Sequence, residues 1–459
     1  MQAIYIVKVM DNKPIYQRIA NSIIQSIQKG NIAQDTKLPS IRKVAKEYGV
    51  SNLTVLNAMR LLEDERIVYA MPKKGYFVRS MLPSINGDSI PNEKEHLYSL
   101  LASENNSGLT LSNGHIDLYP VQKISKIMRK QIYQNPNLLG GNISGHGHEL
   151  LIDEIIRRAI EYGCSFSKNE ICITNGGLES LSLALRATTS QGDTVLVQSP
   201  TYFYTLKFIS ELGLKCISVQ HFDDIEHHLE RHKVKVMVFN ANFNNPDGIL
   251  LSESHKQRLV ELSKLHRFTI IEDDVYGDIH FTKRRPKPIR TYSSDVILCN
   301  TFTKAIAPGL RIGWIAASNH TEKIKELKQS TSKYTAEFPQ AAIAEFLRSG
   351  GYDLHMRKLR STLVSFRDEV RLAILEAFPE GTWVSEPEGG FVLWVKLPNR
   401  LPNLEAKIEE ASSLGKHFVP GHFFSLEEDC NHCLRLNFGF GLTEEVKTAI
   451  QQLGTVFCE

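Results

Sequence analysis

The sequence contains no uninterrupted apolar run of the roughly 18–20 residues that a membrane-spanning helix requires. Its first residues, MQAIYIVKVMDNKP, show no basic start followed by a long apolar stretch and a small-residue cleavage site, so no secretion signal is expected. Cysteine is scarce, with 7 residues in a chain of 459 and no regular spacing. This odd, scattered set argues against a disulfide framework and favours a reducing, cytoplasmic location without membrane contact.

One cysteine pair resembles part of a metal site. Cys430 and Cys433 flank an asparagine and a histidine in the segment CNHC. A structural zinc ion takes four ligands, and no second cysteine pair or close histidine pair follows. Two interpretations of this segment are therefore possible: half of a zinc site, or two cysteines in the apolar core. The apolar segment LRLNF directly after Cys433 favours the core position, so we expect no bound metal.

The chain is too long for one ordinary domain, so we expect two or three folded units. Hydrophobic residues make up 42% and charged residues 23% of it, which is enough apolar material for a sizeable core. The net charge of +3 is unevenly divided: residues 1–80 hold 13 Lys and Arg against 6 Asp and Glu, a balance of +7. The remaining residues are therefore mildly acidic, and the basic head suggests a polyanionic partner.

The head shows the pattern of three short helices and a hairpin. Residues 14–29 place five isoleucines (Ile15, Ile19, Ile23, Ile24, Ile27) on one helical stripe. In the next segment, KLPSIRKVAKEYGVSNLTVLNAMRLLEDE, Ser40 and Ser51 are positioned to cap two helices and Gly49 to form the turn between them. This pattern predicts a helix-turn-helix, whose second helix can enter a major groove. The segment RIVYAMPKKGYFVRS then predicts a basic hairpin, or wing.

These segments resemble the winged helix of GntR-type regulators across residues 13–79, through PIYQRIA, KLPSIRKVAKEYGVS and GYFV. The resemblance implies DNA contacts by a set of residues on the helices and on the wing. Arg and Lys would contact phosphates, and polar groups on the second helix would contact base edges. A winged helix used for protein contacts is the alternative, and the balance of +7 argues against it. The implied DNA-binding residues are Arg42, Ser51, Asn52, Thr54, Asn57, Lys73, Lys74, Gly75 and Tyr76.

Three parts follow along the chain: a DNA-binding domain at residues 1–79, a polar linker at 80–108 with a short helix near 96–101, and a large domain at 109–459. In the large domain, strand-like runs alternate with helical stretches. The runs are ICIT, TVLVQS, CISVQ, VMVFNA, TIIEDDVY, VILCNT and RIGWIA. Such alternation predicts an α/β fold with a mostly parallel sheet and a ligand site at the carboxyl ends of its strands.

Polar residues suited to a ligand lie where these runs end. The turn Thr174-Asn175-Gly176-Gly177 opens into a helix, so its backbone amides could bind a phosphate, although this motif alone is more often a plain strand-to-helix turn. Lys304 stands at the end of a buried run. A buried lysine is unfavourable unless it is paired or deprotonated, and a lowered pKa is what an imine-forming amine requires. Taken singly, each such residue is as easily explained as an exposed turn residue.

Together they resemble fold-type I aminotransferases over residues 109–459, and TFTKAIAPGLRIGW is the most specific segment. The resemblance implies that Lys304 binds pyridoxal 5′-phosphate covalently and is the catalytic residue. Asp273 would pair with the protonated ring nitrogen, and Arg435 would bind the carboxylate of an amino-acid ligand. The other implied contacts are the ring hydroxyl for Asn245 and Tyr276, stacking for Tyr202, and the phosphate for Gly177, Leu178, Thr301, Thr303 and Arg311.

The joined architecture resembles MocR-type regulators, a GntR subgroup. That resemblance implies a head-to-tail homodimer that binds a double-stranded DNA operator and senses a small amino compound or pyridoxal phosphate itself. A second function stays open, namely a working aminotransferase with an accessory DNA-binding head. The sequence permits the chemistry, and we expect at most partial or slow turnover, because Leu178 stands where many relatives have glutamine.

Overall fold

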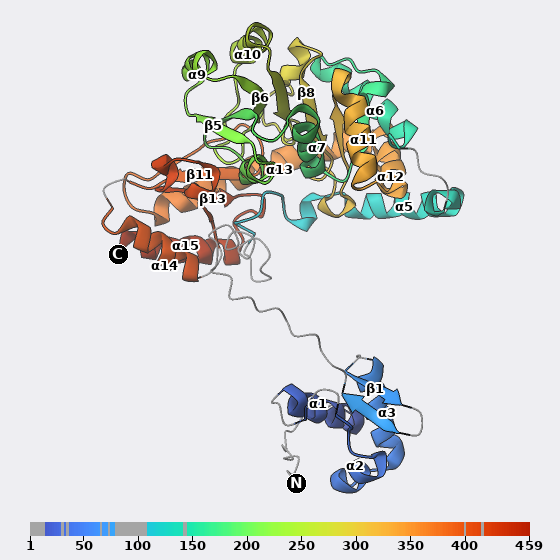
Figure 1. Ribbon diagram of the computed structural model, residues 1–459. Coiled ribbons are helices and arrows are strands. Elements are labelled where there is room, and N and C mark those ends of the chain that lie inside the picture. The colour runs from blue at the N-terminus through green and yellow to red at the C-terminus, as the bar shows by residue number, and fades with distance from the viewer. Residues whose placement is uncertain are drawn as a thin grey trace. The chain divides into compact units, whose positions relative to one another are not determined.

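The computed structural model describes residues 14–28, 32–33, 36–64, 67–71, 74–78, 108–140, 145–398, 401–414 and 417–459 (Figure 1). These residues fall into two compact units, divided between residues 92 and 93. In the described part of the chain, no helix combines the length and the apolar character needed to cross a bilayer. The expected linker lies outside the described residues except for Gly108, and so does the helix expected within it.

The smaller unit has the predicted order of three helices and a hairpin. Ser40 caps the second helix, since its Oγ accepts a hydrogen bond from the backbone N–H of Lys43 at 3.3 Å. Gly49 ends that helix with φ of 64°, a conformation that favours glycine. The elements are α1 (Ile15–Gln28), α2 (Ile41–Tyr48), α3 (Asn52–Asp64), β1 (Val68–Met71) and β2 (Gly75–Val78).

One apolar core holds the smaller unit together. Ile19 and Ile23 of α1 are buried in it, together with Val55 and Leu62 of α3. Ile15 belongs to the predicted helix, but its side chain is 54% exposed. As the first residue of α1, it has no preceding turn beside it to complete a buried surface.

The larger unit is built on a seven-stranded sheet in the order β3-β9-β8-β7-β6-β4-β5. Neighbouring strands from β5 to β8 are parallel, and β9 runs antiparallel to both β3 and β8. The expected mostly parallel sheet is therefore confirmed. The strands are β3 (Ile171–Thr174), β4 (Thr194–Gln198), β5 (Lys215–Val219), β6 (Val234–Phe239), β7 (Thr269–Asp273), β8 (Ile297–Thr301) and β9 (Gly313–Ala316).

Helices surround this sheet (Figure 1). They are α5 (Val121–Gln134), α6 (Glu149–Ala159), α7 (Gly177–Thr188), α8 (Phe203–Glu211), α9 (Ile225–Arg231), α10 (Glu253–His266), α11 (Thr321–Ser330) and α12 (Glu337–Arg348). Short 3₁₀ turns connect several elements: η1 (Ile116–Leu118), η2 (Pro136–Leu139), η3 (Ile160–Tyr162), η4 (Lys168–Glu170), η5 (Phe222–Asp224), η6 (Ile289–Tyr292), η7 (Pro308–Leu310) and η8 (Ser318–His320).

A smaller subdomain follows around an antiparallel sheet in the order β10-β11-β13-β12. The long helix α13 (Gly351–Ala377) leads into it from the large sheet. Its other elements are β10 (Trp383–Val384), β11 (Val392–Lys396), α14 (Leu404–Leu414), β12 (Val419–Pro420), η9 (Gly421–Phe424), η10 (Glu428–Cys430), β13 (Cys433–Asn437) and α15 (Glu444–Cys458).

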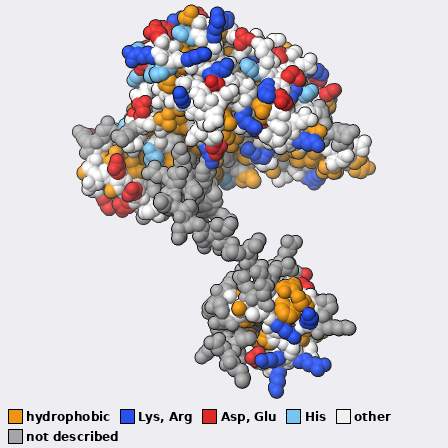
Figure 2. Space-filling model, viewed as in Figure 1, with side chains coloured by type: hydrophobic (Ala, Val, Ile, Leu, Met, Phe, Trp, Pro, Cys, Tyr) orange, Lys and Arg blue, Asp and Glu red, His pale blue; other side chains and the backbone are white. Residues whose placement is uncertain are grey.

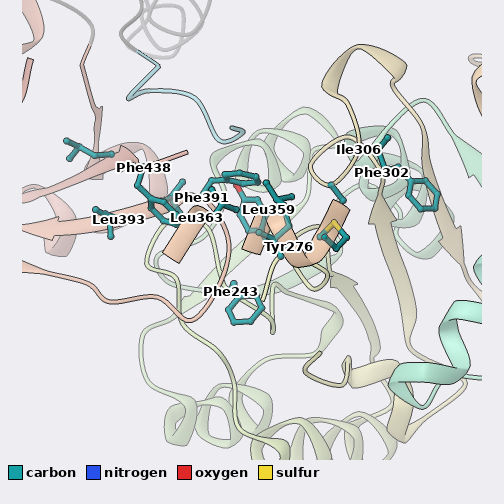
Figure 3. Packing of buried hydrophobic residues seen from close by; sticks show 14 of the residues in the cluster. Phe243, Tyr276, Phe302, Ile306, Leu359, Leu363, Phe391, Leu393 and Phe438 are labelled. Atoms are coloured by element: carbon teal, nitrogen blue, oxygen red, sulfur yellow. The ribbon is translucent and has the colours of Figure 1, made fainter. Parts of the chain in front are cut away.

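A single core cluster joins the two subdomains. Leu359 and Leu363 of α13 pack in it with Tyr276, which follows β7, and with Phe391, which precedes β11 (Figure 3). The rings of Tyr276 and Phe391 meet edge to face, with centroids 6.0 Å apart. This continuous burial fixes the small sheet against the carboxyl ends of the large sheet, where the polar residues of the candidate site lie.

Candidate active site and nucleic-acid interface

A cavity of about 160 Å³ lies at the carboxyl ends of the central strands. The structure brings together all ten residues that the sequence predicted around a cofactor, since each of them lines this cavity. They are Gly177, Leu178, Tyr202, Asn245, Asp273, Tyr276, Thr301, Thr303, Lys304 and Arg311. Four further residues complete the lining, and no sequence signal had marked them: Ser112, Leu181, Asn240 and Val275.

Lys304 follows β8 and projects its amine into the cavity. Its Nζ donates hydrogen bonds to the backbone oxygen of Ser112 at 2.8 Å and to the Ser112 hydroxyl at 3.1 Å. Burial and the positive charges of Arg435 and Arg311 lower the pKa of this amine to about 8. Near neutral pH, a useful fraction of the amine is therefore unprotonated and able to attack a carbonyl carbon.

Asp273 ends β7 on the same side of the cavity. Burial raises the pKa of its carboxyl group to about 7, and the neighbouring charge of Asp274 raises it further. Its Oδ1 atom is buried and has no hydrogen-bond partner. An unpartnered buried oxygen is unfavourable, and a ligand with a positively charged N–H group would satisfy it. The aminotransferase-type ring nitrogen is such a group.

The opposite end of the cavity is suited to a phosphate. Gly177 and Leu178, the first residues of α7, line the cavity, and Gly176, the N-cap of this helix, has φ of 93°. A Cβ atom at Gly176 would lie 2.8 Å from Nη2 of Arg311, so only glycine leaves that guanidinium in place. Thr301 and Thr303 add hydroxyl groups, with their Oγ1 atoms 2.8 Å apart. Backbone amides, hydroxyls and a guanidinium form a typical phosphate site.

Asn245, Tyr276 and Tyr202 lie between these two ends. Asn245 is buried, and its Oδ1 atom has no partner. The hydroxyl of Tyr276 donates to the backbone oxygen of Ser112 at 3.1 Å. Tyr202 precedes α8 and is surrounded by aromatic side chains, with its ring 4.8 Å from that of Phe203. This arrangement offers polar contacts at the edge of a flat ring and an aromatic surface beside it.

Arg435 does not line the cavity but lies behind it on β13. Its side chain is 1% exposed, and its Nη2 donates a hydrogen bond to the backbone oxygen of Thr110. Its Nε atom is buried without a partner. Burial lowers the pKa of this guanidinium to about 10, although Tyr276 and Tyr202 act in the opposite direction. A buried guanidinium with spare donors and no carboxylate partner is suited to binding a ligand carboxylate.

Residues 108–113 cover these groups and form what we call the entry segment, because it follows the expected linker. The carbonyls of Thr110 and Ser112 accept hydrogen bonds from Arg435 and Lys304. The carbonyls of Gly108 and Asn113 accept from Nδ2 of Asn437, at 2.8 Å and 2.9 Å. The first stretch of the large domain is thus bound by the same side chains that a ligand would contact.

In the smaller unit, the predicted DNA-binding residues share one end of the helix-turn-helix. Ser51 caps α3, since its Oγ accepts from the backbone N–H of Thr54 at 3.1 Å. Ser51, Asn52 and Asn57 are exposed at the beginning of α3 and Thr54 is half-buried, while Arg42 is exposed on α2. Exposed polar groups at the first turns of a second helix are the arrangement that reads base edges in a major groove.

The hairpin β1–β2 follows as expected, with Met71 opposite Gly75. Lys74 and Gly75 are exposed at its turn and Tyr76 is half-buried, whereas Lys73 lies outside the described residues. Figure 2 shows Lys and Arg side chains gathered along one edge of this unit. A basic helix-turn-helix with a basic wing provides the charge that phosphate contacts require.

Neither cysteine of the CNHC segment faces solvent. Cys430 is 4% and Cys433 1% exposed, which confirms the expected core position of Cys433. No group of three or more His, Cys, Asp or Glu side chains placed to hold a metal ion occurs within the residues that the structure describes.

These two units define a class: a winged helix-turn-helix regulator with an aminotransferase-like domain. Comparison with known families agrees, because residues 15–78 match the gntR family of bacterial regulatory proteins and residues 108–453 match aminotransferase class I and II. The chain therefore belongs to the aminotransferase class I and II family and, with its gntR-type head, to the MocR-type transcription regulators.

Individual relatives include both transcription regulators and aminotransferases. The helix-turn-helix-type transcriptional regulator YdcR of Escherichia coli (strain K12) is 30% identical over 97% of this chain and 99% of its own. Aromatic-amino-acid aminotransferase 1 of Thermococcus litoralis is 31% identical over 65% of this chain and 75% of its own. The crystal structure of Pyrococcus horikoshii kynurenine aminotransferase in complex with PMP covers 80% of this chain and 94% of its own, with 27% identity and a TM-score of 0.73.

Proposed function

We propose that this regulator binds pyridoxal 5′-phosphate at Lys304 and changes its affinity for a DNA operator when a small amino compound enters the same site. The observation that carries the proposal is the convergence of all ten predicted cofactor residues on one cavity of about 160 Å³. The unpartnered oxygens of Asp273 and Asn245 and the phosphate-sized cradle at Gly176 support the fit of this cofactor. A chromosomal operator implies that the protein acts in the cytoplasm.

Each part of the cavity has a distinct task in this proposal. Pyridoxal phosphate, when bound, supplies an aldehyde and an electron-withdrawing ring. The amine of Lys304, with its pKa of about 8, holds the cofactor covalently, and Asp273 keeps a proton on the ring nitrogen. Arg311 and the amides at the start of α7 bind the phosphate. Arg435 selects effectors that carry a carboxylate.

The entry segment supports a route from effector to DNA-binding head. An amino acid in the cavity would place its amine where Lys304 now meets Ser112, and its carboxylate where Arg435 now meets Thr110. The ligand would therefore compete with the two carbonyls and release the stretch that the linker joins. A ligand shifts a conformational equilibrium only through such a difference in contacts between two states.

The experiment measures operator affinity and hydrogen exchange together. Holo-protein is mixed with its footprinted operator, and a panel of amino compounds is screened for a change in affinity. A compound that changes the affinity is expected to speed amide exchange in the entry segment, residues 108–113. A protein that protects no DNA sequence, with or without cofactor, contradicts the regulator. A change in operator affinity without faster exchange in the entry segment contradicts only the proposed route.

A second function has support from Lys304, Asp273 and Arg435 together, because these groups would permit amino-group transfer once pyridoxal phosphate is bound. In this alternative the protein is a working aminotransferase with an accessory DNA-binding head. Multiple turnovers between common amino and keto acids would favour it. A single conversion that stalls at one equivalent per chain favours the sensor.

We also propose a head-to-tail homodimer, which the family resemblance implies. Exposed apolar side chains on α5 and η2 support an association surface, with Tyr133 90% and Leu139 66% exposed. Light scattering of the Tyr133→Glu variant tests this surface. We expect a monomer, and an unchanged dimer would place the interface elsewhere.

A further inference from the structure

A second cavity, of about 550 Å³, lies on the other face of the large sheet. Asn300 and Thr301 are neighbours on β8, but Asn300 lines this cavity and Thr301 lines the Lys304 pocket. Successive side chains of a strand point to opposite faces, so the sheet itself separates the two sites. We call the second cavity the rear pocket. Its walls come from the end of α6, the turn η3, the first turns of α13 and residues 278–287.

Positive charge predominates in the rear pocket. Its lining includes seven Lys and Arg side chains against three Asp and Glu side chains. The acidic residues are Glu161, Asp278 and Asp353. The basic residues are Arg158, Lys283, Arg284, Arg285, Lys287, Arg357 and Arg360.

The acidic groups inside the pocket already have partners. Asp278 pairs with Nε of Arg285 at 2.5 Å and accepts a hydrogen bond from the hydroxyl of Tyr352 at 2.5 Å. Burial opposes the ionised carboxylate, but these contacts prevail and hold the pKa of Asp278 well below its usual range. Asp353 pairs with Arg158. These two carboxylates are thus committed to Arg285 and Arg158.

Two guanidinium groups keep unused donors. Arg360 is half-buried, and its Nε donates to the backbone oxygen of Asp278 at 2.9 Å, but it forms no ion pair with any described residue. Burial lowers the pKa of Arg360, the charge of Asp278 opposes this, and the positive charges of Arg285 and Arg158 act with burial, so that the net pKa is lowered. Nη1 of Arg158 is buried without any hydrogen-bond partner. A buried donor without a partner, beside a guanidinium whose charged form burial disfavours, is an arrangement that a bound anion would stabilise.

The remaining walls are suited to an organic ligand. Trp314, Phe302 and Met356 provide buried apolar surface, while Lys283 and Arg357 are exposed at the rim. A cavity of this volume is in the usual range of roughly 300–1,000 Å³ for small-molecule sites. A planar guanidinium binds phosphate through paired hydrogen bonds, and rim cations would draw a dianion inward.

We propose that the rear pocket binds a small phosphorylated metabolite, with its phosphate group between Arg360 and Arg158. This site is separate from the Lys304 pocket and does not depend on the proposed cofactor. It would give the regulator a second small-molecule input, read from the opposite face of the same sheet.

The test uses the full-length chain, with inorganic phosphate and phenyl phosphate as probes and chloride at equal ionic strength as the salt control. Calorimetry gives affinity, and fluorescence of Trp314 reports occupancy of the pocket. We expect the Arg360→Gln variant to bind phenyl phosphate at least about tenfold more weakly, as the loss of a charged hydrogen bond implies. Lys358→Gln, on the exposed side of the same helix, should bind like the parent protein.

Two further variants decide where the anion sits. Arg311→Gln removes the guanidinium of the Lys304 pocket and Arg42→Gln removes a head cation, and binding should persist in both. Binding that disappears in either of them, or that survives in Arg360→Gln, overturns the proposal, as does no binding to the parent protein. If Arg360→Gln fails to fold, the rim variant Arg357→Gln is tested instead. Because Arg357 is an exposed charge, we expect its loss to lower the affinity for phenyl phosphate about threefold. An unchanged affinity would overturn the site.

Discussion

The amine of Lys304 donates hydrogen bonds to both the backbone oxygen and the hydroxyl of Ser112, although the two residues are 192 positions apart in the chain. This contact joins the group expected to hold the cofactor to the stretch that follows the linker. Tyr276 binds the same carbonyl of Ser112, and Arg435 binds that of Thr110. The side chains expected to bind the cofactor and the effector therefore contact the same backbone segment that follows the linker to the head.

Lys304→Ala should abolish covalent cofactor binding. The protein purified with excess pyridoxal phosphate is expected to show a visible absorbance band, and borohydride should fix the cofactor to the tryptic peptide that contains Lys304. Both signals should disappear in the variant, because no other lysine lines the cavity. Lys323→Ala, an exposed lysine paired with Glu326, is the matched control and should keep them. Labelling of another lysine in the parent protein would refute the assignment.

Asp273→Asn should stabilise the cofactor-free protein at pH 8 and weaken cofactor binding. The folded pKa of about 7 lies above the unfolded value of about 3.8. Below pH 3.8 both states are protonated. Between pH 3.8 and 7 the unfolded state loses its proton first, so stability falls as pH rises, and above pH 7 the full penalty of about 4 kcal/mol applies.

Urea unfolding from pH 4 to pH 8 measures this effect. The advantage of Asp273→Asn over the parent protein should grow up to pH 7 and then stay constant. The exposed Asp295→Asn variant is the control for replacing a carboxylate by an amide outside the cavity. An Asp273→Asn protein that is equally stable and binds cofactor as tightly would show that this carboxylate is neither strained nor in contact with the ring.

Gly176→Ala should displace Arg311 and reduce cofactor affinity by more than about tenfold, since one charged hydrogen bond contributes about that much. The added methyl group would lie 2.8 Å from Nη2 of Arg311, and φ of 93° is unfavourable for alanine. Gly140→Ala is the control, because no atom lies within 4 Å of its added Cβ and its φ is −133°. Spectroscopic titration with pyridoxal phosphate measures the difference, and equal affinities for the two variants would remove the phosphate role of this turn.

Much of the cavity was predictable because its residues come from a few continuous segments. TFTKAIAPGLRIGW alone supplies Thr301, which ends β8, Thr303 and Lys304, which follow within three residues, and Arg311, which follows η7. The seven strand-like runs also correspond to the seven strands of the large sheet. Local patterns of this kind depend on strand ends, which the sequence marks clearly.

Contacts across the chain were not predictable. Ser112 lies in a polar stretch without helical or strand periodicity, and only the fold brings it to Lys304. The antiparallel direction of β9 has no sequence signal, since a buried strand has the same apolar pattern in either direction. Arg360 belongs to an ordinary amphipathic helix. Among the described residues it forms no ion pair, because the carboxylate of Asp278 pairs with Arg285 and Arg360 bonds only to the Asp278 backbone oxygen.

Arg42→Ala should weaken operator binding and flatten its dependence on salt. Each phosphate contact contributes about one unit to the slope of log affinity against log salt concentration, so the slope should fall by about 1. Arg18→Ala, an exposed arginine on α1, which is not one of the two helices of the helix-turn-helix, serves as control and should keep the parent slope. Gel shifts over a range of salt concentrations measure both. A parent-like slope in Arg42→Ala would mean that this side chain does not contact DNA.

Arg435→Gln should change which effectors the protein recognises while leaving the bond between Lys304 and the cofactor intact. Arg435 is buried, its Nε has no hydrogen-bond partner and it forms no ion pair with a described residue, so its removal takes away the guanidinium that donates to the Thr110 carbonyl of the entry segment. An amino acid should then perturb the visible spectrum at least about tenfold more weakly, whereas a simple amine without a carboxylate should act as it does on the parent protein. Equal losses for both ligands would indicate general damage to the cavity, and equal retention of both would show that the carboxylate is bound elsewhere. The distinction matters because an effector that does not contact Arg435 leaves its bond to Thr110 unbroken, and the entry segment would then stay attached on that side.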